Sequence, residues 1–425
     1  MNDTIFALSS GSVPAAIAVV RISGPDAGLA LASLVGPMPP PRSPSVRRLR
    51  DEGGETLDIA LVTWFAGPRT ATGEDLAELH CHGGRAVVAA VLDRLGRMPG
   101  LREAEPGEFT RRAFANGQID LAQAEGLADL LSAETEWQRR GALVAAGGAL
   151  SNRLEDWRSR VLVLSAELEA AIDFSDEDDV ASLSAQFRES LAALADEIER
   201  VAQRPSADRM RDGVRVVFSG PPNAGKSSLF NALLNEGVAI VSAEAGTTRD
   251  VIERPVALGG VPFVFADTAG LRDTGAGEIE EIGIERARDQ MERADIVLWL
   301  GSPDDAPKDS IRVLSKSDLI GDSPKHPADY FVSSVTGHGL DELSKDLVAR
   351  GKLALPPPDR VALNRRQKGQ AREAGLALSR AAELTDMLAI AEELRTARVA
   401  IDRLSGRNST EDMLDALFGR FCIGK

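Results

Sequence analysis

The feature that most constrains this chain is a glycine-rich loop between an apolar run and a helix-forming segment. Val214 to Phe218 has the composition of a buried strand, Gly220 interrupts it, and Ser228 to Leu234 has apolar residues at helical spacing. The motif Gly220-x4-Gly225-Lys226-Ser227 lies at that junction. Glycines let backbone N–H groups point at a polyphosphate, the lysine adds a positive charge, and the serine hydroxyl can bind Mg²⁺. The pattern predicts a nucleotide-binding α/β unit.

Size and charge limit what the rest of the chain can be. The chain has 425 residues, more than one core normally holds, so we expect about two to four domains. Its formal net charge of -16 repels nucleic acid, and contact with RNA would need a local basic patch. A run of basic residues is more often a solvated charged face than a binding site. Two segments could supply a patch: Arg47, Arg48 and Arg50, or Arg365, Arg366, Lys368 and Arg372.

The cysteines and apolar runs bear on location. Cys81 and Cys422 are too far apart in sequence to suggest a disulfide framework, and no charged and apolar leader opens the chain. We therefore expect a cytoplasmic protein. The longest apolar runs, Ala15 to Val20 and Ile296 to Leu300, are too short to cross a membrane, so no membrane association is expected.

The hydrophobic pattern divides the chain into a multidomain protein of α/β and all-α parts. Residues 1–117 combine strand-like runs with a helix over Ala86 to Leu95 and are assigned to an N-terminal α/β domain. Residues 118–210 and 355–425 have helical spacing and are interpreted as one discontinuous helical domain. Residues 211–354 alternate strands and helices, as in a Ras-like P-loop domain with a mostly parallel sheet. Pro205 to Gly213 and Leu355 to Asp359 would be its two hinges.

An aspartate after a later strand indicates which base is bound. The strand predicted over Ile311 to Leu314 is followed by Ser315-Lys-Ser-Asp318. A carboxylate there can accept both the N1–H and the exocyclic amine of guanine, and adenine offers no such pair of donors, so Asp318 favours GTP over ATP. Related GTPases have asparagine where Ser315 stands. We expect serine to lose the amide that contacts the base and braces the phosphate loop, and so to weaken binding of GTP.

Two further segments resemble the switch regions of NTPases. Thr248 could supply a second hydroxyl for Mg²⁺, and Asp267 ends a predicted strand where a carboxylate can hold the water shell of the ion. Leu271 follows Gly270, so the glutamine that orients water in many small GTPases is missing. The nearby candidates for that task are Glu278, Glu280 and Glu281.

Asn223 lies inside the phosphate loop and carries a neutral carbonyl. Such a group suits a monovalent cation, which could provide the charge that an arginine finger would give. His80-Cys81-His82 is less informative, because adjacent strand positions point to opposite faces and no second ligand cluster exists. Cys81 is better interpreted as a packed free thiol. Cys422 is either a nucleophile or a residue that fills a gap.

Motifs throughout the chain resemble the tRNA modification GTPase family MnmE, also called TrmE. The resemblance rests on Arg21-Ile-Ser-Gly24, Thr72-Gly-Glu-Asp75 with Glu78, His82-Gly-Gly84, Pro106-Gly-Glu-Phe109, Asp120-Leu-Ala-Gln-Ala-Glu125, Ile282-Gly-Ile-Glu-Arg286 and Phe421-Cys-Ile-Gly-Lys425. It implies a folate-binding N-terminal domain that mediates a homodimer, and a GTPase inserted into a helical domain. The implied cofactors are Mg²⁺, K⁺ and 5,10-methylene- or 5-formyl-tetrahydrofolate.

The resemblance also implies a partner and a reaction. The partner would be MnmG (GidA), an FAD protein that forms a heterotetramer with it. Together such proteins place an aminomethyl or carboxymethylaminomethyl group on carbon 5 of the wobble uridine, U34, of certain tRNAs. GTP hydrolysis would depend on K⁺.

The resemblance assigns roles to individual residues. Ser227 and Thr248 would bind Mg²⁺, and Asn223, Ser242, Glu244 and Thr247 would surround K⁺. Glu280, with Glu278 or Glu281 as alternatives, would orient the attacking water; Asn223 and Cys422 are the other catalytic candidates. Arg21, Glu78, Gln118 and Lys425 would contact the folate, with Gln118 where the family often has lysine. The expected GTP contacts are Asn223, Ala224, Gly225, Lys226, Ser227, Ser228, Ser242, Ala243, Glu244, Ala245, Gly246, Thr247, Thr248, Asp267, Thr268, Ala269, Gly270, Ser315, Lys316, Ser317, Asp318, Ser333, Ser334 and Val335.

The alternative function is a GTPase switch or assembly factor that binds RNA or the ribosome and takes no part in modification chemistry. The GTPase motifs fit both functions. The terminal Cys-Ile-Gly-Lys and the folate-like N-terminal motifs favour the modification enzyme, because an assembly factor would more plausibly end in an RNA-binding module.

Overall fold

The computed structural model describes residues 3–173, 183–239, 252–267, 288–319, 327–407, 411–419 and 421–424. They form two compact units. The first joins Met1–Ala128 to Asp402–Lys425, and the second is Asp129–Ile401. The chain therefore returns at its C-terminal end to the unit in which it began.

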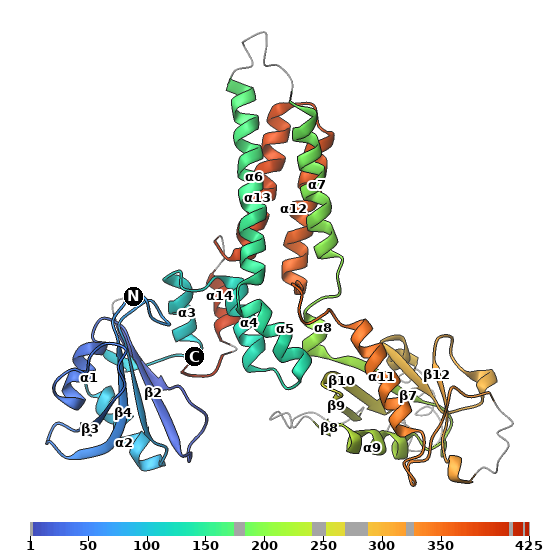
Figure 1. Cartoon of the computed structure of the whole chain (residues 1–425), viewed down its shortest axis with the longest axis horizontal. Helices are drawn as coiled ribbons and strands as arrows, with labels where there is room; N and C mark the ends of the chain where they lie inside the picture. The colour runs from blue at the N-terminus through green and yellow to red at the C-terminus, as the bar shows by residue number, and fades with distance from the viewer. Residues whose placement is uncertain are drawn as a thin grey trace, which may run out of the picture. The chain divides into compact units, whose positions relative to one another are not determined.

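The first unit contains a six-stranded sheet with the strand order β3-β4-β5-β2-β1-β6 (Figure 1). Neighbouring strands are antiparallel, except that β1 and β6 are parallel. Apolar side chains of α1 and α2 pack on one face of the sheet, and Leu31 and Val91 belong to the same buried cluster as Ile22 and Leu79. The bounds are β1 Thr4–Leu8, β2 Ile17–Ser23, α1 Ala27–Val35, β3 Ser45–Arg50, β4 Thr56–Phe65, β5 Leu76–His82, α2 Arg85–Gly96 and β6 Leu101–Glu103.

Three more helices complete the first unit: α3 Glu108–Ala115, the start of α4 Leu121–Leu131, and α14 Glu411–Phe418. Phe109 of α3 packs with Ile5 and Ala7 of β1, on the face of the sheet away from α1. Phe418 and Phe421 pack on Leu121. The C-terminal residues are therefore held by an apolar cluster, and Gly424 lies against the end of β1, where an added Cβ would stand 2.2 Å from the Leu8 carbonyl.

The second unit contains a seven-stranded sheet with the order β13-β12-β11-β7-β10-β9-β8. The five strands from β13 to β10 are parallel, and β9 and β8 continue the sheet in antiparallel fashion. The bounds are β7 Val214–Ser219, α9 Lys226–Glu236, β8 Val238–Ala239, β9 Ile252–Leu258, β10 Val261–Asp267, β11 Ile296–Trp299, β12 Ile311–Leu314, β13 Tyr330–Phe331 and α11 Leu340–Ala354. The apolar run in β7 is buried between helices, as a central parallel strand must be.

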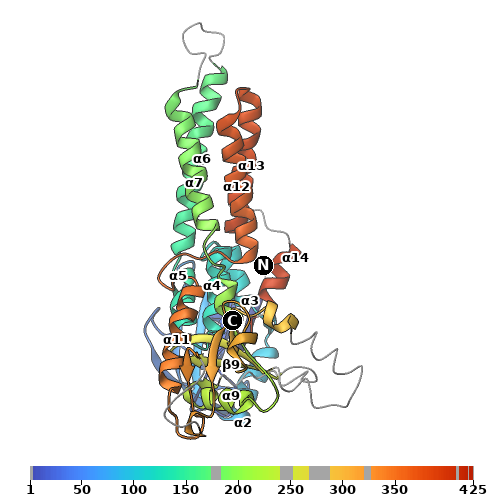
Figure 2. The same ribbon diagram turned by 90° about the vertical axis from the view of Figure 1, so that its right-hand side faces the viewer.

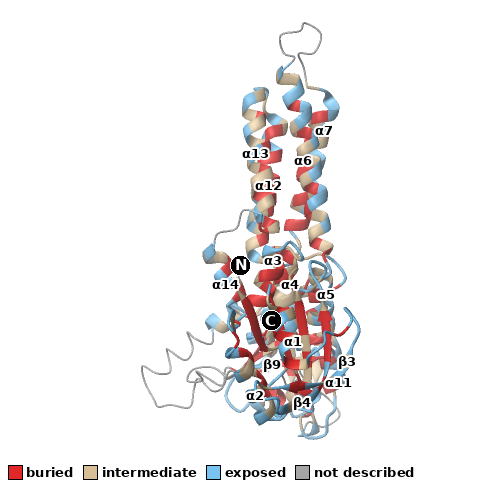
Figure 3. Cartoon of the chain, turned by 90° about the vertical axis from the view of Figure 1, so that its left-hand side faces the viewer, coloured by how far each residue is buried: buried red, intermediate tan, exposed pale blue. Residues whose placement is uncertain are grey.

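Four long helices of the second unit lie side by side as a bundle (Figures 1 and 2). They are α6 Ala149–Asp173, α7 Ala185–Ala202, α12 Arg365–Glu383 and α13 Met387–Ser405. Their buried residues run as stripes at three- and four-residue spacing, for example Trp157, Val161, Leu164 and Leu168 of α6 (Figure 3). Helices that precede and follow the seven-stranded sheet in the chain thus share one core.

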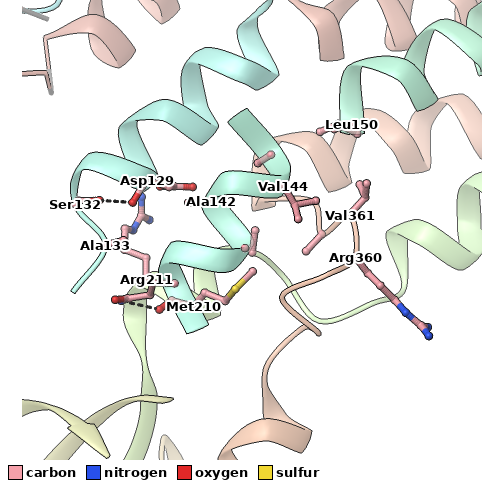
Figure 4. A pocket seen from close by; sticks show the side chains of 15 residues that line it. Asp129, Ser132, Ala133, Ala142, Val144, Leu150, Met210, Arg211, Arg360 and Val361 are labelled. Atoms are coloured by element: carbon pink, nitrogen blue, oxygen red, sulfur yellow. Dashed lines mark hydrogen bonds between the residues drawn. The ribbon is translucent and has the colours of Figure 1, made fainter. Parts of the chain in front are cut away.

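The two connections to the nucleotide-binding unit are tied to α5 Glu136–Ala146. The Trp137 indole N–H donates to the Pro356 carbonyl at 3.1 Å, and the Gln138 amide donates to the Met210 carbonyl at 3.0 Å. The first connection, predicted as a hinge over Pro205 to Gly213, contains the short helix α8 Asp208–Asp212. A small cavity of about 60 Å³ lies between α5 and the two connections (Figure 4).

The predicted fold class is confirmed, and the predicted strands and helices lie within a few residues of the observed ones. Among the described helices, none is both long enough and apolar enough to cross a membrane. The acidic segment Ser175-Asp-Glu-Asp-Asp179 lies outside the described residues.

Candidate functional site

The phosphate loop joins β7 to α9, as the sequence predicted. Its lysine, Lys226, is 5% exposed and folds back over the loop. The Nζ atom of Lys226 donates to the carbonyls of Gly220 at 3.0 Å and Pro221 at 2.9 Å. Gly225 has a φ of 89°, a conformation that glycine adopts without strain. The loop therefore places a buried ammonium group within its curve at the N-terminus of α9, where an anion is favoured.

Two oxygen groups meet beside the lysine. Because β10 is parallel to β7 and pairs Asp267 with Phe218, the carboxylate of Asp267 lies at the same edge of the sheet as the loop. The Ser227 hydroxyl donates to Asp267 Oδ2 at 2.8 Å. Hydroxyl and carboxylate oxygens are the ligands that Mg²⁺ prefers, so this pair fits a magnesium ion.

Ser315 contacts the phosphate loop directly. Its hydroxyl donates to the Ala224 carbonyl, and a Cβ added to Gly225 would stand 2.8 Å from the Ser315 oxygen. Lys316 Nζ donates to the Asn223 carbonyl at 2.9 Å. The expectation that serine loses the brace to the loop is therefore wrong, because its shorter side chain reaches a backbone carbonyl through a close approach that Gly225 permits.

Asp318 is exposed and held from one side. Its Oδ1 atom accepts a hydrogen bond from Ser333 at 2.5 Å, and the Ser333 hydroxyl in turn accepts from the backbone N–H groups of Val335 and Thr336. The structure thus brings together the two segments predicted to contact guanine. Ser334 and Val335 follow Ser333 in the second segment, and Val335 is 87% exposed.

Asn223 has a φ of 60° and an exposed side chain. Its backbone carbonyl accepts a hydrogen bond from Lys316, so the side-chain amide is the part of Asn223 that can face a bound ion. Several predicted residues lie outside the described residues: Ser242, Ala243, Glu244, Ala245, Gly246, Thr247, Thr248, Thr268, Ala269, Gly270, Glu278, Glu280, Glu281 and Lys425.

In the first unit, Arg21 and Glu78 form an ion pair on the open face of the sheet. Arg21 Nη2 donates to Glu78 Oε1 at 2.8 Å, and the guanidinium lies 5.8 Å from the centre of the Phe109 ring. The other carboxylate oxygen of Glu78 lies 3.4 Å from His80 Nε2. Two of the predicted folate residues are therefore neighbours, and they form a charged group on an aromatic surface.

The C-terminal segment runs beside the start of α3. The Gly107 N–H donates to the Cys422 carbonyl at 3.4 Å, and Ile423 forms a β-bridge with Pro106. Gly107 has a φ of 71°, and a Cβ at this position would stand 2.2 Å from the Phe418 carbonyl, so only glycine fits. Cys422 is an exposed free cysteine, and its own backbone carbonyl accepts the bond that ties this segment to the start of α3.

Cys81 is a buried free cysteine on β5, as predicted. Burial, followed by the charge of Asp58, raises its pKa to about 12. His82 Nδ1 lies 2.7 Å from Asp58 Oδ1, and His80 faces Glu78. No group of three metal-ligating side chains occurs in the described ranges.

Comparison with known proteins identifies the family. A model described as "GTP-binding protein TrmE N-terminus" matches residues 4–118, and one described as "MnmE helical domain" matches residues 121–422. A "tRNA modification GTPase MnmE" from Erythrobacter litoralis is 58% identical over 423 residues, which is 100% of both chains. The chain belongs to the MnmE family. Another MnmE, from Novosphingobium aromaticivorans, is 54% identical over 437 residues, again 100% of both chains.

Part of this MnmE-family chain also resembles solved structures of other proteins. The G domain of the T. maritima FeoB iron transporter is 27% identical and covers 32% of this chain and 98% of its own, with a TM-score of 0.24. The family assignment therefore rests on the relatives in sequence. It confirms the resemblance that the motifs predicted.

One set of residues in the MnmE-family motifs was not predicted to form a site. Arg112 of α3 is 1% exposed and lies among three carboxylates. Its Nη2 atom is 3.0 Å from both Asp3 Oδ1 and Glu108 Oε1, and its Nη1 atom is 3.2 Å from Glu74 Oε2. Ser23 Oγ donates to the same Glu74 oxygen at 2.8 Å. The only sequence signal was Glu108 four residues before Arg112, a common helical pair.

This network joins three of the MnmE-family motifs that had been noted separately. Ser23 follows Arg21, Glu74 precedes Glu78, and Glu108 precedes Phe109. Burial raises the pKa of Glu108, but hydrogen bonds from Arg102, the Glu105 N–H and Arg112 outweigh burial, and the pKa lies below its usual range. The Arg112 network therefore carries fixed charges next to the Arg21–Glu78 pair.

Gln118 follows α3 and contacts the loop of another MnmE-family motif. Its Nε2 atom would lie 3.2 Å from a Cβ added to Gly73, and it donates to the Asn116 carbonyl at 3.4 Å. The exposed amide is neutral. This position can therefore offer a ligand a hydrogen bond but no charge.

Proposed function

We propose that this protein hydrolyses GTP as a step in the modification of carbon 5 of the wobble uridine, U34, of tRNA. The observation that carries the proposal is the phosphate loop, with Lys226 inside it and Ser227 2.8 Å from Asp267, in a chain of the MnmE family. Asp318, held by Ser333, supports guanine as the base. The product would carry an aminomethyl or carboxymethylaminomethyl group.

The domain roles in this proposal follow the predicted boundaries. Residues 211–354 would bind GTP, residues 1–117 would bind a tetrahydrofolate and form a homodimer, and residues 118–210 with 355–425 would form the helical domain. Ser227 and Thr248 would hold Mg²⁺, which neutralises charge on the phosphates when it is bound. The Ser227–Asp267 pair supports this assignment, because it places two oxygen ligands at the end of the loop.

Potassium is the proposed source of further positive charge. Asn223, Ser242, Glu244 and Thr247 would surround K⁺, and Glu280 would orient the attacking water. The exposed amide of Asn223 beside the phosphate loop supports the first of these roles. A neutral carbonyl oxygen suits a weakly hydrated monovalent cation. Because it carries no negative charge, it does not neutralise the loop lysine, Lys226.

The one-carbon donor would bind at the Arg21–Glu78 pair. The pterin of 5,10-methylene- or 5-formyl-tetrahydrofolate presents N–H donors, which suit the carboxylate of Glu78, and a flat ring, which suits the surface of Arg21 over Phe109. Gln118 and Lys425 would contact the remainder. Cys422 is a candidate nucleophile, and MnmG, an FAD protein, is the proposed partner in a heterotetramer.

The decisive experiment is mass spectrometry of U34 in tRNA from cells that lack this gene, with and without the gene returned. We expect the modification to disappear and to return with the native gene, but not with Lys226→Ala. Unchanged U34 in the deletion would favour the alternative of an RNA or ribosome assembly GTPase and would sink the proposal.

Two measurements on the purified protein test its finer parts. Hydrolysis of GTP in KCl should exceed that in NaCl several-fold, and equal rates would remove the potassium role. Asp318→Asn replaces an acceptor with a donor, so it should lose GTP and accept xanthosine triphosphate, whose C2 carries a carbonyl. Hydrolysis of GTP by Asp318→Asn at the native rate would contradict the assigned base contact.

A further inference from the structure

Six cations gather at one end of the helix bundle and are here named the basic cluster: Arg153, Arg204, Arg360, Arg365, Lys368 and Arg372. They come from four segments, namely the start of α6, the connection after α7, the connection before α12, and α12 itself. Arg365, Lys368 and Arg372 have helical spacings of three and four residues, so they share one face of α12. Four of the six lie close together in the sequence, and Arg153 and Arg204 come from much earlier in the chain.

The contacts show that these segments meet. Lys368 Nζ donates to the Arg204 carbonyl, and Arg204 Nη1 donates to the Val361 carbonyl at 3.3 Å. Burial, and then the charges of Arg153 and Arg360, lower the pKa of Arg204. Burial and the charge of Arg372 likewise lower the pKa of Lys368, against a smaller opposing effect of Asp208. The cations are close enough to repel one another.

The basic cluster has few acidic neighbours. Within the described ranges, none of its six members has a carboxylate oxygen within 4.0 Å. Asp208 is shared by Arg211 and the backbone N–H of Arg365, and Glu197 is bonded to Arg160. Other arginines of the same unit have partners: Arg139 with Glu136, Arg160 with Glu197, Arg209 with Asp295, Arg312 with Asp329, Arg350 with Asp346, Arg380 with Glu393, and Arg395 with Glu392.

We propose that the basic cluster binds the phosphate backbone of the tRNA substrate. This inference rests on the proposed function, which supplies the RNA. A chain with a net charge of -16 repels RNA as a whole, so binding needs a surface on which positive charge is locally unopposed. Arg365 and Arg372 are ~10 Å apart along α12, about one Debye length at physiological salt, so the charges attract a polyanion together.

The geometry favours an extended polyanion over a single phosphate. Arg360, Arg365 and Arg372 are exposed, and Figure 4 shows the Arg360 side chain directed away from the cavity beside it. A site for one phosphate would need several buried donors converging on one point. Planar guanidinium groups spread over four segments instead match a row of phosphates, and they would contact the backbone without reading its sequence.

The test compares two variants of the full-length chain that carry the same net charge. The cluster variant is Arg360→Gln/Arg365→Gln/Arg372→Gln. The control variant is Arg350→Gln/Arg380→Gln/Arg395→Gln, which removes three exposed arginines that have carboxylate partners. Binding of an unmodified tRNA transcript is measured by filter retention over a range of KCl concentrations, and GTP hydrolysis is measured alongside to check folding.

We expect the cluster variant to bind tRNA ~10-fold more weakly than the native chain at 0.1 M salt, as the loss of three exposed charge contacts predicts. The slope of log K against log salt should be shallower by about two to three. The control variant should match the native chain in both. GTP hydrolysis should be equal in all three.

Equal tRNA affinity and salt slope in the two variants would overturn the proposal, as would a native chain that binds no tRNA. Loss of binding to vesicles rich in phosphatidylglycerol, with tRNA binding retained, would also overturn it in favour of a membrane surface. These outcomes differ from failure of the proposed function, which would appear as unchanged U34 in the gene deletion.

Discussion

Two arginine-rich regions of the molecule treat positive charge in opposite ways. Arg112 is 1% exposed and is surrounded by the carboxylates of Asp3, Glu74 and Glu108. In the basic cluster Arg360, Arg365 and Arg372 are exposed, the other three members are half-buried, and no carboxylate lies within ion-pair distance among the described residues. In the first region the charges pair with one another and stabilise the fold. In the second region they have no such partners, and we propose that they bind a ligand.

Desolvation explains the difference. A charge taken out of water must be matched by other charges and hydrogen bonds, or the folded state is lost. An exposed cation keeps its water, so leaving it unmatched costs little. Unmatched charges are therefore tolerated only at the surface, and a surface that gathers several of them is a candidate for binding an anion.

The largest effect should come from removing the matched, buried charge. Arg112→Met keeps the apolar stem and should lower the free energy of unfolding by about 3–5 kcal/mol, because three carboxylates lose their shared cation. Urea denaturation monitored by circular dichroism would measure it. Arg111→Met is the control: Arg111 is 30% exposed and pairs with Glu411 and Asp415, so the loss should stay below about 1 kcal/mol. Equal losses would show that burial is not what distinguishes the regions.

The second prediction uses pH. The pKa of Glu108 in the folded protein is depressed, so its charge stabilises the fold above the unfolded pKa and stops doing so as the pH falls through the folded pKa. Glu108→Gln should therefore cost about 2 kcal/mol at pH 7. The difference from the native chain should shrink as the pH falls below the usual range of a glutamate. A cost that stays constant from pH 7 to pH 3 would mean that packing, rather than charge, holds Glu108.

The third prediction concerns the hydroxyl group of Ser315, which already donates its one proton to a hydrogen bond within the protein. The Ser315 hydroxyl has one proton and donates it to the Ala224 carbonyl, so it cannot donate to the acceptors N7 and O6 of guanine. Ser315→Asn adds a second donor and should bind GTP about two- to tenfold more tightly, which is one hydrogen bond. Titration with GTP and 7-deaza-GTP would separate the contacts, because only GTP offers N7. Equal GTP affinities of the native chain and the variant would remove the idea.

The smallest effect should come from the basic cluster itself. Arg360→Gln/Arg365→Gln/Arg372→Gln removes like charges that have no partner, so stability should change by less than about 0.5 kcal/mol. The same variant should lose most of its affinity for tRNA with little change in stability. Arg112→Met, in contrast, should lower stability. Destabilisation by ~2 kcal/mol or more would place these arginines in the fold.

Local patterns accounted for most of the elements. The strand before Gly220, the helix after it, and the order of strands and helices up to α11 could be predicted because each depends on neighbouring residues. The helical turn at Asp208–Asp212 was missed, since the segment reads as a breaker-rich hinge and its contacts come from α5. The brace from Ser315 was also missed, because it depends on how closely Gly225 lets two loops approach.

By itself the sequence determined that a phosphate loop follows a buried strand, that Asp318 favours guanine, and that the chain belongs with the MnmE family, because residue type and spacing decide these. Only the tertiary structure decided which charges are matched. Arg112 and Arg372 look alike in sequence, each on an amphipathic helix with a glutamate nearby. Their surroundings differ because the fold brings the carboxylates of Asp3 and Glu74 to Arg112, whereas the charge of Arg372 acts on Lys368, whose ammonium group donates to the carbonyl of Arg204.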